Sequence, residues 1–250
     1  VPTGGVVADV AFATAARAVA VGSDGLVATS DDGGVTWTNR LAGGTVALTG
    51  LSASRRALVA YGPNGAVVRS VDGGGTWAQV WAPTTAHIVG AAFPGTGLGY
   101  AADASGGVFV TTNGGVSWRR VPGDIGTRLS GLAATPSGTA FVWTDSAMRR
   151  ARRGGRFARV PLPFTRARVL SVQVAGGRLF LATTGAVWRS DSGGHRWRRM
   201  ALPAGASGVR GVSCPARPVC WLVTGSRRVY VTRSAGRDWA STTAAVGRPH

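Results

Sequence analysis

The sequence contains no lysine and no glutamate, so its 28 basic residues are all arginine and its 10 acidic residues are all aspartate. Lysine and glutamate are good helix formers, and their absence argues against long surface helices. The sequence has no apolar run of the roughly 18 residues that a membrane-spanning helix needs, so no transmembrane segment is predicted. Histidine occurs three times and cysteine twice, which leaves few ligands for a zinc site. We therefore predict no metal and no cofactor.

The two cysteines, Cys214 and Cys220, flank a Pro-Ala-Arg-Pro stretch that is typical of a turn. This spacing fits a disulfide that closes a hairpin, with two reduced structural thiols as the alternative. A disulfide would indicate an oxidising compartment. Because the chain also begins with valine rather than methionine, we expect a secreted or otherwise extracytoplasmic protein whose signal peptide was removed, with a trimmed chain as the alternative.

The formal net charge is +18 and the pI is about 11.9. Such a charge favours anionic partners, including an acidic protein surface, an acidic glycan or nucleic acid. A compositional bias without a specific partner is the alternative. Hydrophobic residues make up 44% of the chain and include 9 tryptophans, which argues against disorder.

One short element recurs along the chain. Residues 30–37 read Ser-Asp-Asp-Gly-Gly-Val-Thr-Trp, and copies follow at 70–77, 111–118, 190–197 and 232–239, with a nearly erased copy at 150–157. The aromatic residues that end the copies are spaced by 39 to 42 positions: Trp37, Trp77, Trp118, Phe157, Trp197 and Trp239. A regular period of this length indicates a repeat fold, and six units fill the chain.

Each unit contains short β-branched and aromatic runs between glycine-rich turns. In the second unit we predict strands at 46–52, 57–61, 66–70 and 76–81. Four strands in about 40 residues are typical of a propeller blade, and such blades bury their faces against one another. The prediction is an all-β, six-bladed β-propeller of four-stranded antiparallel blades, with seven blades as the alternative. Residues 1–250 would form a single domain with blades at 6–44, 45–84, 85–125, 126–165, 166–205 and 206–245.

The repeated element resembles the Asp-box of bacterial neuraminidase (BNR) repeats, which reads Ser/Thr-x-Asp-x-Gly-x-Thr/Ser-Trp. WD40/YVTN-like propellers share the period, but no Trp-Asp dipeptide ends a unit here. We interpret the element as structural, because short acceptors can bind amides of their own turn and glycine adopts backbone conformations closed to other residues. The residues assigned this role are Ser30, Asp32, Gly34, Trp37, Ser70, Asp72, Gly74, Trp77, Asn113, Gly115, Trp118, Gly194, Trp197, Gly236 and Trp239.

Candidate binding residues fall into two groups. In a propeller, the turns between second and third strands share one face with the segments between blades, and ligands usually use that face. That face would carry Trp81, Arg128, Arg166, Arg168, Arg227 and Arg228, with Asp24, Asn64, Asp103 and Asp145 in its turns. The second group is the densest basic run, which coincides with the erased copy of the element and is expected on an edge strand at the outer rim: Arg149, Arg150, Arg152 and Arg153. Protection of an edge strand by charge is the alternative explanation for this run.

Sialidases share the Asp-box and the propeller, and that resemblance implies an arginine triad for a substrate carboxylate, a tyrosine nucleophile with an acidic partner, and an aspartate acid/base. Here Tyr61, Tyr100 and Tyr230 lie in apolar strands that read as core. Glutamate is absent, and so is the Arg-Ile-Pro sequence that is typical of sialidases. The sequence therefore favours a protein without catalytic residues, and an exo-sialidase-like hydrolase is the alternative.

The chain is also similar to photosystem II stability/assembly factor propellers. That resemblance implies a docking surface in which an arginine-rich patch contacts a protein. We accordingly expect a monomeric, non-catalytic binding scaffold that docks a protein or an anionic glycan. Nucleic acid is not expected, because the basic run lacks interleaved aromatic residues.

Overall fold

The computed structural model describes residues 5–14, 16–41, 46–53, 57–122, 125–175, 177–206, 208–216, 219–226, 228–234 and 237–242. The density of contacts divides the chain into two compact units, Val1–Thr144 with Arg149–Ala158, and Asp145–Met148 with Arg159–His250. The prediction that the whole chain is one domain stays a prediction.

The described residues form six antiparallel sheets, each built from four consecutive strands. The first three sheets comprise β1 (Val7–Phe12), β2 (Ala18–Gly22), β3 (Leu26–Ser30), β4 (Thr38–Leu41), β5 (Gly50–Ala53), β6 (Leu58–Tyr61), β7 (Val67–Ser70), β8 (Ala78–Gln79), β9 (Ile88–Ala92), β10 (Gly99–Asp103), β11 (Val108–Thr111) and β12 (Arg119–Arg120). The fourth comprises β13 (Gly131–Ala134), β14 (Thr139–Trp143), β15 (Met148–Arg152) and β16 (Ala158–Val160). The last two comprise β17 (Ser171–Ala175), β18 (Arg178–Thr183), β19 (Ala186–Ser190), β20 (Arg198–Arg199), β21 (Val209–Ala216), β22 (Val219–Thr224), β23 (Val229–Thr232) and β24 (Ala240–Thr242).

The predicted fold class is confirmed: the chain is a six-bladed β-propeller of four-stranded antiparallel blades. The one helical element of the described residues is a short 3-10 turn, η1 (Ser23–Gly25). In the described part of the chain, no helix has the length and apolar character needed to cross a membrane.

Strands of the second blade are shorter than predicted. The first, β5, begins at Gly50 rather than at residue 46. Of the residues before it, Leu48 donates its amide hydrogen to the Gly22 carbonyl of the first blade at 2.9 Å, whereas Thr49 donates to the Tyr61 carbonyl of its own blade at 2.8 Å. The segment between the two blades is therefore tied to both of them.

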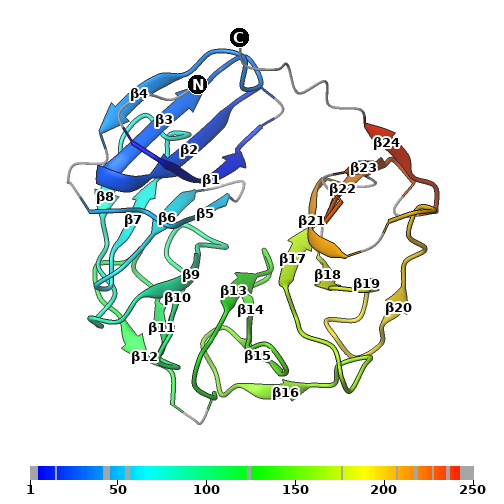
Figure 1. The fold of residues 1–250 in the computed structure, drawn as a ribbon. Helices are drawn as coiled ribbons and strands as arrows, with labels where there is room; N and C mark the ends of the chain where they lie inside the picture. The colour runs from blue at the N-terminus through cyan, green and yellow to red at the C-terminus, as the bar shows by residue number, and fades with distance from the viewer. Residues whose placement is uncertain are drawn as a thin grey trace. The chain divides into compact units, whose positions relative to one another are not determined.

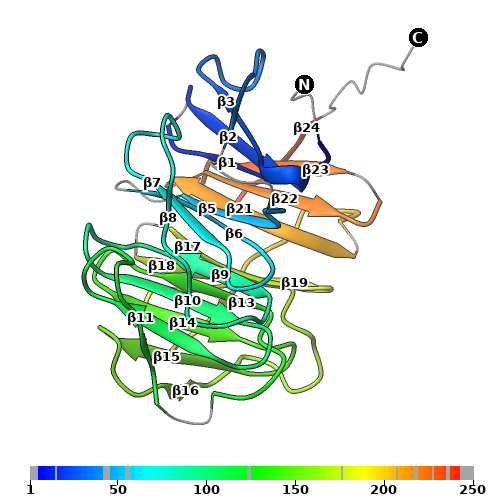
Figure 2. The ribbon, with the colours of Figure 1, turned by 90° about the vertical axis from the view of Figure 1, so that its left-hand side faces the viewer.

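In the first unit, the blades pack face to face, and Figures 1 and 2 show their sheets following one another along the chain. The first strands β1, β5, β9 and β13 contact one another in this order. Apolar clusters join the first blade to the second, the second to the third, and the third to the fourth. The central strands β2, β3, β10 and β11 are buried along their whole length, whereas the outer strands β8 and β12 are exposed.

In the second unit, one cluster joins the fifth and sixth blades and includes Phe180, Leu222 and the buried Cys220. The predicted disulfide also needs Cys214, whose side chain lies outside the described part of the structure. The disulfide therefore stays a prediction.

Candidate functional site

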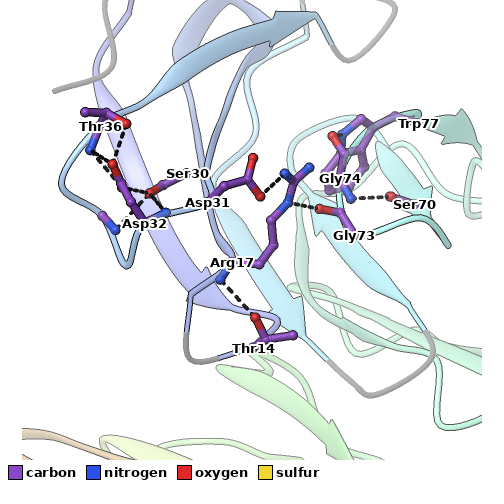
Figure 3. A network of polar contacts seen from close by, with 11 residues as sticks. Thr14, Arg17, Ser30, Asp31, Asp32, Thr36, Ser70, Gly73, Gly74 and Trp77 are labelled. Atoms are coloured by element: carbon purple, nitrogen blue, oxygen red, sulfur yellow. Dashed lines mark hydrogen bonds and ion pairs between the residues drawn. The ribbon is translucent and has the colours of Figure 1, made fainter.

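The aspartates of the first two repeated turns bind groups of their own turn, and Figure 3 shows this for Asp32. Asp32 accepts hydrogen bonds from the Thr36 amide at 2.9 Å and from the Ser30 hydroxyl at 2.7 Å. Asp72 in the second blade accepts the equivalent bond from the Thr76 amide at 2.9 Å. These hydrogen bonds hold the pKa of both carboxyl groups well below the usual range of aspartate. Both groups are accordingly ionised and engaged within the turn.

A buried hydroxyl residue begins the turn in every blade except the fourth, where Arg150 stands at this position. In the first blade the Ser30 hydroxyl accepts the Gly34 amide at 2.8 Å, and Ser70, Thr111 and Ser190 do the same for the second glycine of their turns. The acceptor two positions later varies. It is Asn113 in the third blade, Ser192 in the fifth and Ser234 in the sixth, each binding the amide four residues on. In these three blades an uncharged side chain makes the hydrogen bond that the carboxylate makes in the first two, and in the fourth blade Arg152 holds the position.

Replacing Asp72 by asparagine tests this account. The folded-state pKa of Asp72 lies below its unfolded value near 4, so its ionised form stabilises the fold above about pH 4 and this contribution is lost as the pH falls. We expect urea unfolding, followed by tryptophan fluorescence, to find the variant less stable than the wild type at about pH 7, with a difference that shrinks steadily as the pH is lowered from about 4 to about 2. A constant difference across this range would contradict the role of the charge.

In the second, third and fifth blades, the second glycine of the turn meets the preceding blade. A Cβ on Gly115, whose φ is +99°, would lie 2.5 Å from the Cβ of Val80. In the second unit, a Cβ on Gly194 would lie 2.5 Å from a methyl group of Val160. Glycine is needed at this position both for its backbone conformation and for the close approach.

Indole groups fasten three of the turns to the blade before them. Trp118 donates its Nε1 hydrogen to the Val80 carbonyl at 2.9 Å, Trp197 to Pro161 at 2.9 Å, and Trp239 to Ala201 at 2.7 Å. In the first two blades, Trp37 and Trp77 bind instead the carbonyl of the second glycine in their own turn. Gly236 lies outside the described residues.

Some arginines also join blades. Arg17 of the first blade donates to the Gly73 carbonyl of the second at 2.8 Å and pairs with Asp31 (Figure 3). Arg69 of the second blade donates to the Thr96 carbonyl at 2.9 Å and places its guanidinium 4.8 Å from the ring centre of Phe93. Part of the positive charge of the chain therefore stabilises blade packing.

The predicted binding residues of the inner turns and interblade segments are mostly exposed. Trp81 is 43% exposed and donates to Gln79. Arg168 pairs with Asp145, and Arg128, Arg166 and Arg228 are exposed. Within the described ranges, no hydrogen bond or ion pair joins Trp81, Arg128, Arg166, Arg168 and Arg228 to one another. Arg227 lies outside those ranges.

Asp103 lies at the turn between the second and third strands of its blade, as predicted, but its side chain is buried and unavailable to a ligand. The residue ends β10 and is 2% exposed. Its carboxylate accepts hydrogen bonds from the Gly107 amide at 2.7 Å, from the Ser105 amide at 3.0 Å and from the Thr84 hydroxyl at 2.8 Å. Asp103 therefore stabilises the β10–β11 turn and ties it to the segment that precedes the third blade.

The basic run differs from the prediction in its place within the blade. Arg149, Arg150 and Arg152 belong to β15, the third strand, and β16 lies outside it. The first two side chains are half-buried, whereas Arg152 and Arg153 are exposed. Protection of an edge strand by charge does not explain these residues, because β15 lies between β14 and β16 and so is not at the edge of its sheet. Such protection does fit Arg119 and Arg120 of β12 and Arg198 and Arg199 of β20, which form outer strands.

Tyr61 has an acidic neighbour, as a sialidase nucleophile would. Burial and, less strongly, the negative charge of Asp9 raise the pKa of Tyr61 to about 12. Asp9 itself accepts the Leu51 amide at 2.8 Å, and burial raises its pKa. The pair therefore disfavours the phenolate that nucleophilic attack requires.

A pocket of about 330 Å³ opens among the turns of the third and fourth blades, on the side that carries the repeated turns. It is lined by Pro94, Gly95, Leu98, Thr112, Pro136, Ser137, Gly138 and Arg153. Of these, Arg153 alone was a sequence candidate. The remaining residues come from three turns: β9–β10, the repeated turn β11–β12 that holds Thr112, and β13–β14.

Comparison with solved structures finds the same fold at low sequence identity. YCF48 bound to a D1 peptide matches with a TM-score of 0.74 and 18% identity, over 97% of this chain and 83% of that chain. YCF48 from Cyanidioschyzon merolae matches with a TM-score of 0.71 and 18% identity, over 97% and 86%. A GH74 xyloglucanase from Xanthomonas campestris matches with a TM-score of 0.67 and 18% identity, over 97% and 46%.

The likeness to photosystem II assembly-factor propellers is confirmed at the level of the fold, since YCF48 is such a factor. No family model and no curated protein matches the sequence. At these identities the neighbours establish a fold and leave the activity to be argued from the residues.

Proposed function

We propose that this chain is a non-catalytic binding scaffold that acts outside the cytoplasm and docks an acidic protein partner through the arginines of its fourth blade. The observation that carries the proposal is the inverted charge of one turn. Where the first two blades have Asp32 and Asp72, the fourth has Arg152. Among the described residues, no ion pair reaches Arg149, Arg152 or Arg153.

Two further observations support a protein partner. The exposed Arg152 and Arg153 carry flat guanidinium groups with several donors, which are suited to bind carboxylates. A neighbour with the same fold, YCF48, binds a peptide. An acidic glycan would offer similar carboxylates and is the competing ligand of the experiment below. The hydrolase alternative has less support, because the pKa of Tyr61 is raised rather than lowered.

The test compares two variants that lose the same charge in different places. In one, Arg149, Arg150, Arg152 and Arg153 are replaced by serine. In the control, serine replaces four exposed arginines elsewhere: Arg120, Arg196, Arg198 and Arg237. Binding to an acidic peptide array and to an acidic glycan array is measured at low and physiological salt.

We expect the fourth-blade variant to lose peptide binding about tenfold or more, and the control variant to change it only about twofold, because a docked charge pair depends on geometry. Equal losses in both variants would mean that the basic surface attracts anions without a docking site. A glycan signal that depends on the fourth blade, without a peptide signal, would overturn the choice of partner.

A further inference from the structure

The pocket of the third and fourth blades has a mainly apolar wall and one charge. Pro94, Leu98 and Pro136 supply carbon surface, and Thr112 and Ser137 supply hydroxyl groups. None of the eight described lining residues is acidic, and Arg153 is the cation among them. A volume of about 330 Å³ is at the lower end of ligand-sized pockets. The space suits one side chain rather than a whole cofactor.

The wall of the pocket is held by hydrogen bonds. The buried Tyr100 donates its hydroxyl hydrogen to the Gly138 carbonyl at 2.8 Å from below. The Gly138 amide donates to the Thr135 carbonyl at 2.9 Å, and the Arg153 amide donates to Gly138 at 2.9 Å. The β13–β14 and β15–β16 turns are therefore held in place before a ligand binds, which lowers the entropic cost of binding.

Arg153 has an unusual backbone for a residue with a side chain. Its φ is +46°, in the left-handed region that L-residues other than glycine disfavour. In the first, second, third and fifth blades the same position is held by Gly33, Gly73, Gly114 and Gly193, with φ between +63° and +76°, and in the sixth copy it is Ala235. Arginine is therefore the exception among small residues at this position. Strained residues of this kind concentrate at functional sites.

Other arginines surround the same turn. Arg119 of the third blade donates to the Gly154 carbonyl at 3.1 Å, and Arg152 and Arg156 are exposed beside Arg153. An apolar cavity with a guanidinium in its wall, inside a basic surface, is complementary to an apolar side chain that has carboxylates next to it.

We infer that this pocket holds an apolar anchor side chain of an acidic peptide, and that Arg153 binds the carboxylate adjacent to that anchor. The inference rests on the proposed function for the acidic nature of the partner. It adds to that function a defined pocket, an apolar specificity and a single recognition residue.

The test uses two labelled acidic dodecapeptides, one with a single leucine between aspartates and one with serine in its place. Fluorescence polarisation measures their affinity for the full chain. We expect the leucine peptide to bind about tenfold more tightly, as burial of one leucine side chain predicts. Equal affinities would overturn the inference, and the proposed function would still stand if both affinities were lost in the fourth-blade serine variant. Failure of both peptides to bind in a salt-dependent manner would count against the proposed function as well.

Arg153→Gly separates binding from folding. Glycine restores the residue of the sister turns, so we expect the melting temperature to stay equal or to rise while the leucine peptide binds about tenfold more weakly. The matched control is Arg156→Ser, which removes the same charge from the same turn without lining the pocket. Equal losses in the two variants would overturn the role of Arg153.

Filling the pocket provides a variant that leaves the charge unchanged. Thr112 is an exposed lining residue at the second position of its turn, and Val71 occupies that position in the second blade. We expect Thr112→Trp to abolish the preference for leucine over serine and Val71→Trp to preserve it. A preference that survives Thr112→Trp would place the anchor elsewhere and overturn the inference.

Discussion

Replacing Gly115 by alanine is expected to destabilise the protein by about 3 kcal/mol, the sum of a disfavoured backbone conformation and an overlap with the preceding blade. The added Cβ would lie 2.5 Å from the Cβ of Val80, in a segment that also accepts the Trp118 indole hydrogen. Neither the turn nor the neighbouring blade can move away without breaking that hydrogen bond. The melting temperature should fall by on the order of 10 °C.

Thermal unfolding followed by circular dichroism measures this effect. The control is Gly185→Ala, because a Cβ on Gly185 would meet no atom within 4 Å and its φ is not positive. We expect the control to change the melting temperature by about 2 °C at most. A similar, small change for Gly115→Ala would mean that the turn does not couple the blades.

Replacing Asp103 by alanine is expected to cost about 3 kcal/mol as well, because buried donors lose their acceptor. The Gly107 amide would remain buried without its partner, and the Thr84 hydroxyl would lose its link to the turn. Asp103→Asn keeps one acceptor oxygen and should lose less. Urea unfolding of the three proteins gives the free energies directly.

The control for Asp103 is Asp31→Ala in the repeated turn of the first blade. Asp31 is exposed and pairs with Arg17 at the surface. Ion pairs in water contribute little, so we expect a loss of about 0.5 kcal/mol or less. If both alanine variants lost the same small amount, the hydrogen bonds of Asp103 would not be a major source of stability.

The fold could be predicted because the same sequence element recurs at a regular spacing. The aromatic residue from Trp37 to Trp239 returns every 39 to 42 positions, and a glycine-rich turn precedes it each time in the sequence. Strand limits were less predictable. Leu48 looks like part of a strand by composition, but its amide binds the first blade, and only the packing of two blades decides this.

Burial of single polar residues could not be predicted for the same reason. Asp103 reads as an exposed turn residue until Thr84, from the segment before the third blade, is placed against it. Arg149 and Arg150 read as edge charges until β16 is placed outside them. The position of a residue within one repeat does not determine which strand or segment packs over its side chain.

One residue of the candidate pocket could be predicted from the sequence, but the pocket itself could not. Alignment of the repeated turns places Arg153 at the position of Gly33, Gly73 and Gly114. A left-handed backbone conformation of Arg153 could therefore be predicted from the sequence. The pocket itself could not, because Pro94, Leu98 and Pro136 belong to turns that meet only when the third and fourth blades stack. The serine acceptors Ser192 and Ser234 were also overlooked, since they replace the aspartate of the motif.

The indole hydrogen bonds have a consequence for how such a chain changes over evolution. The donors Trp118, Trp197 and Trp239 each reach an acceptor 36 to 38 residues earlier in the chain. Donor and acceptor therefore recur in phase with the repeat. Duplication or loss of one whole repeat inside such a series regenerates the same fastening at the new junction, so the number of blades can change without the invention of a new contact.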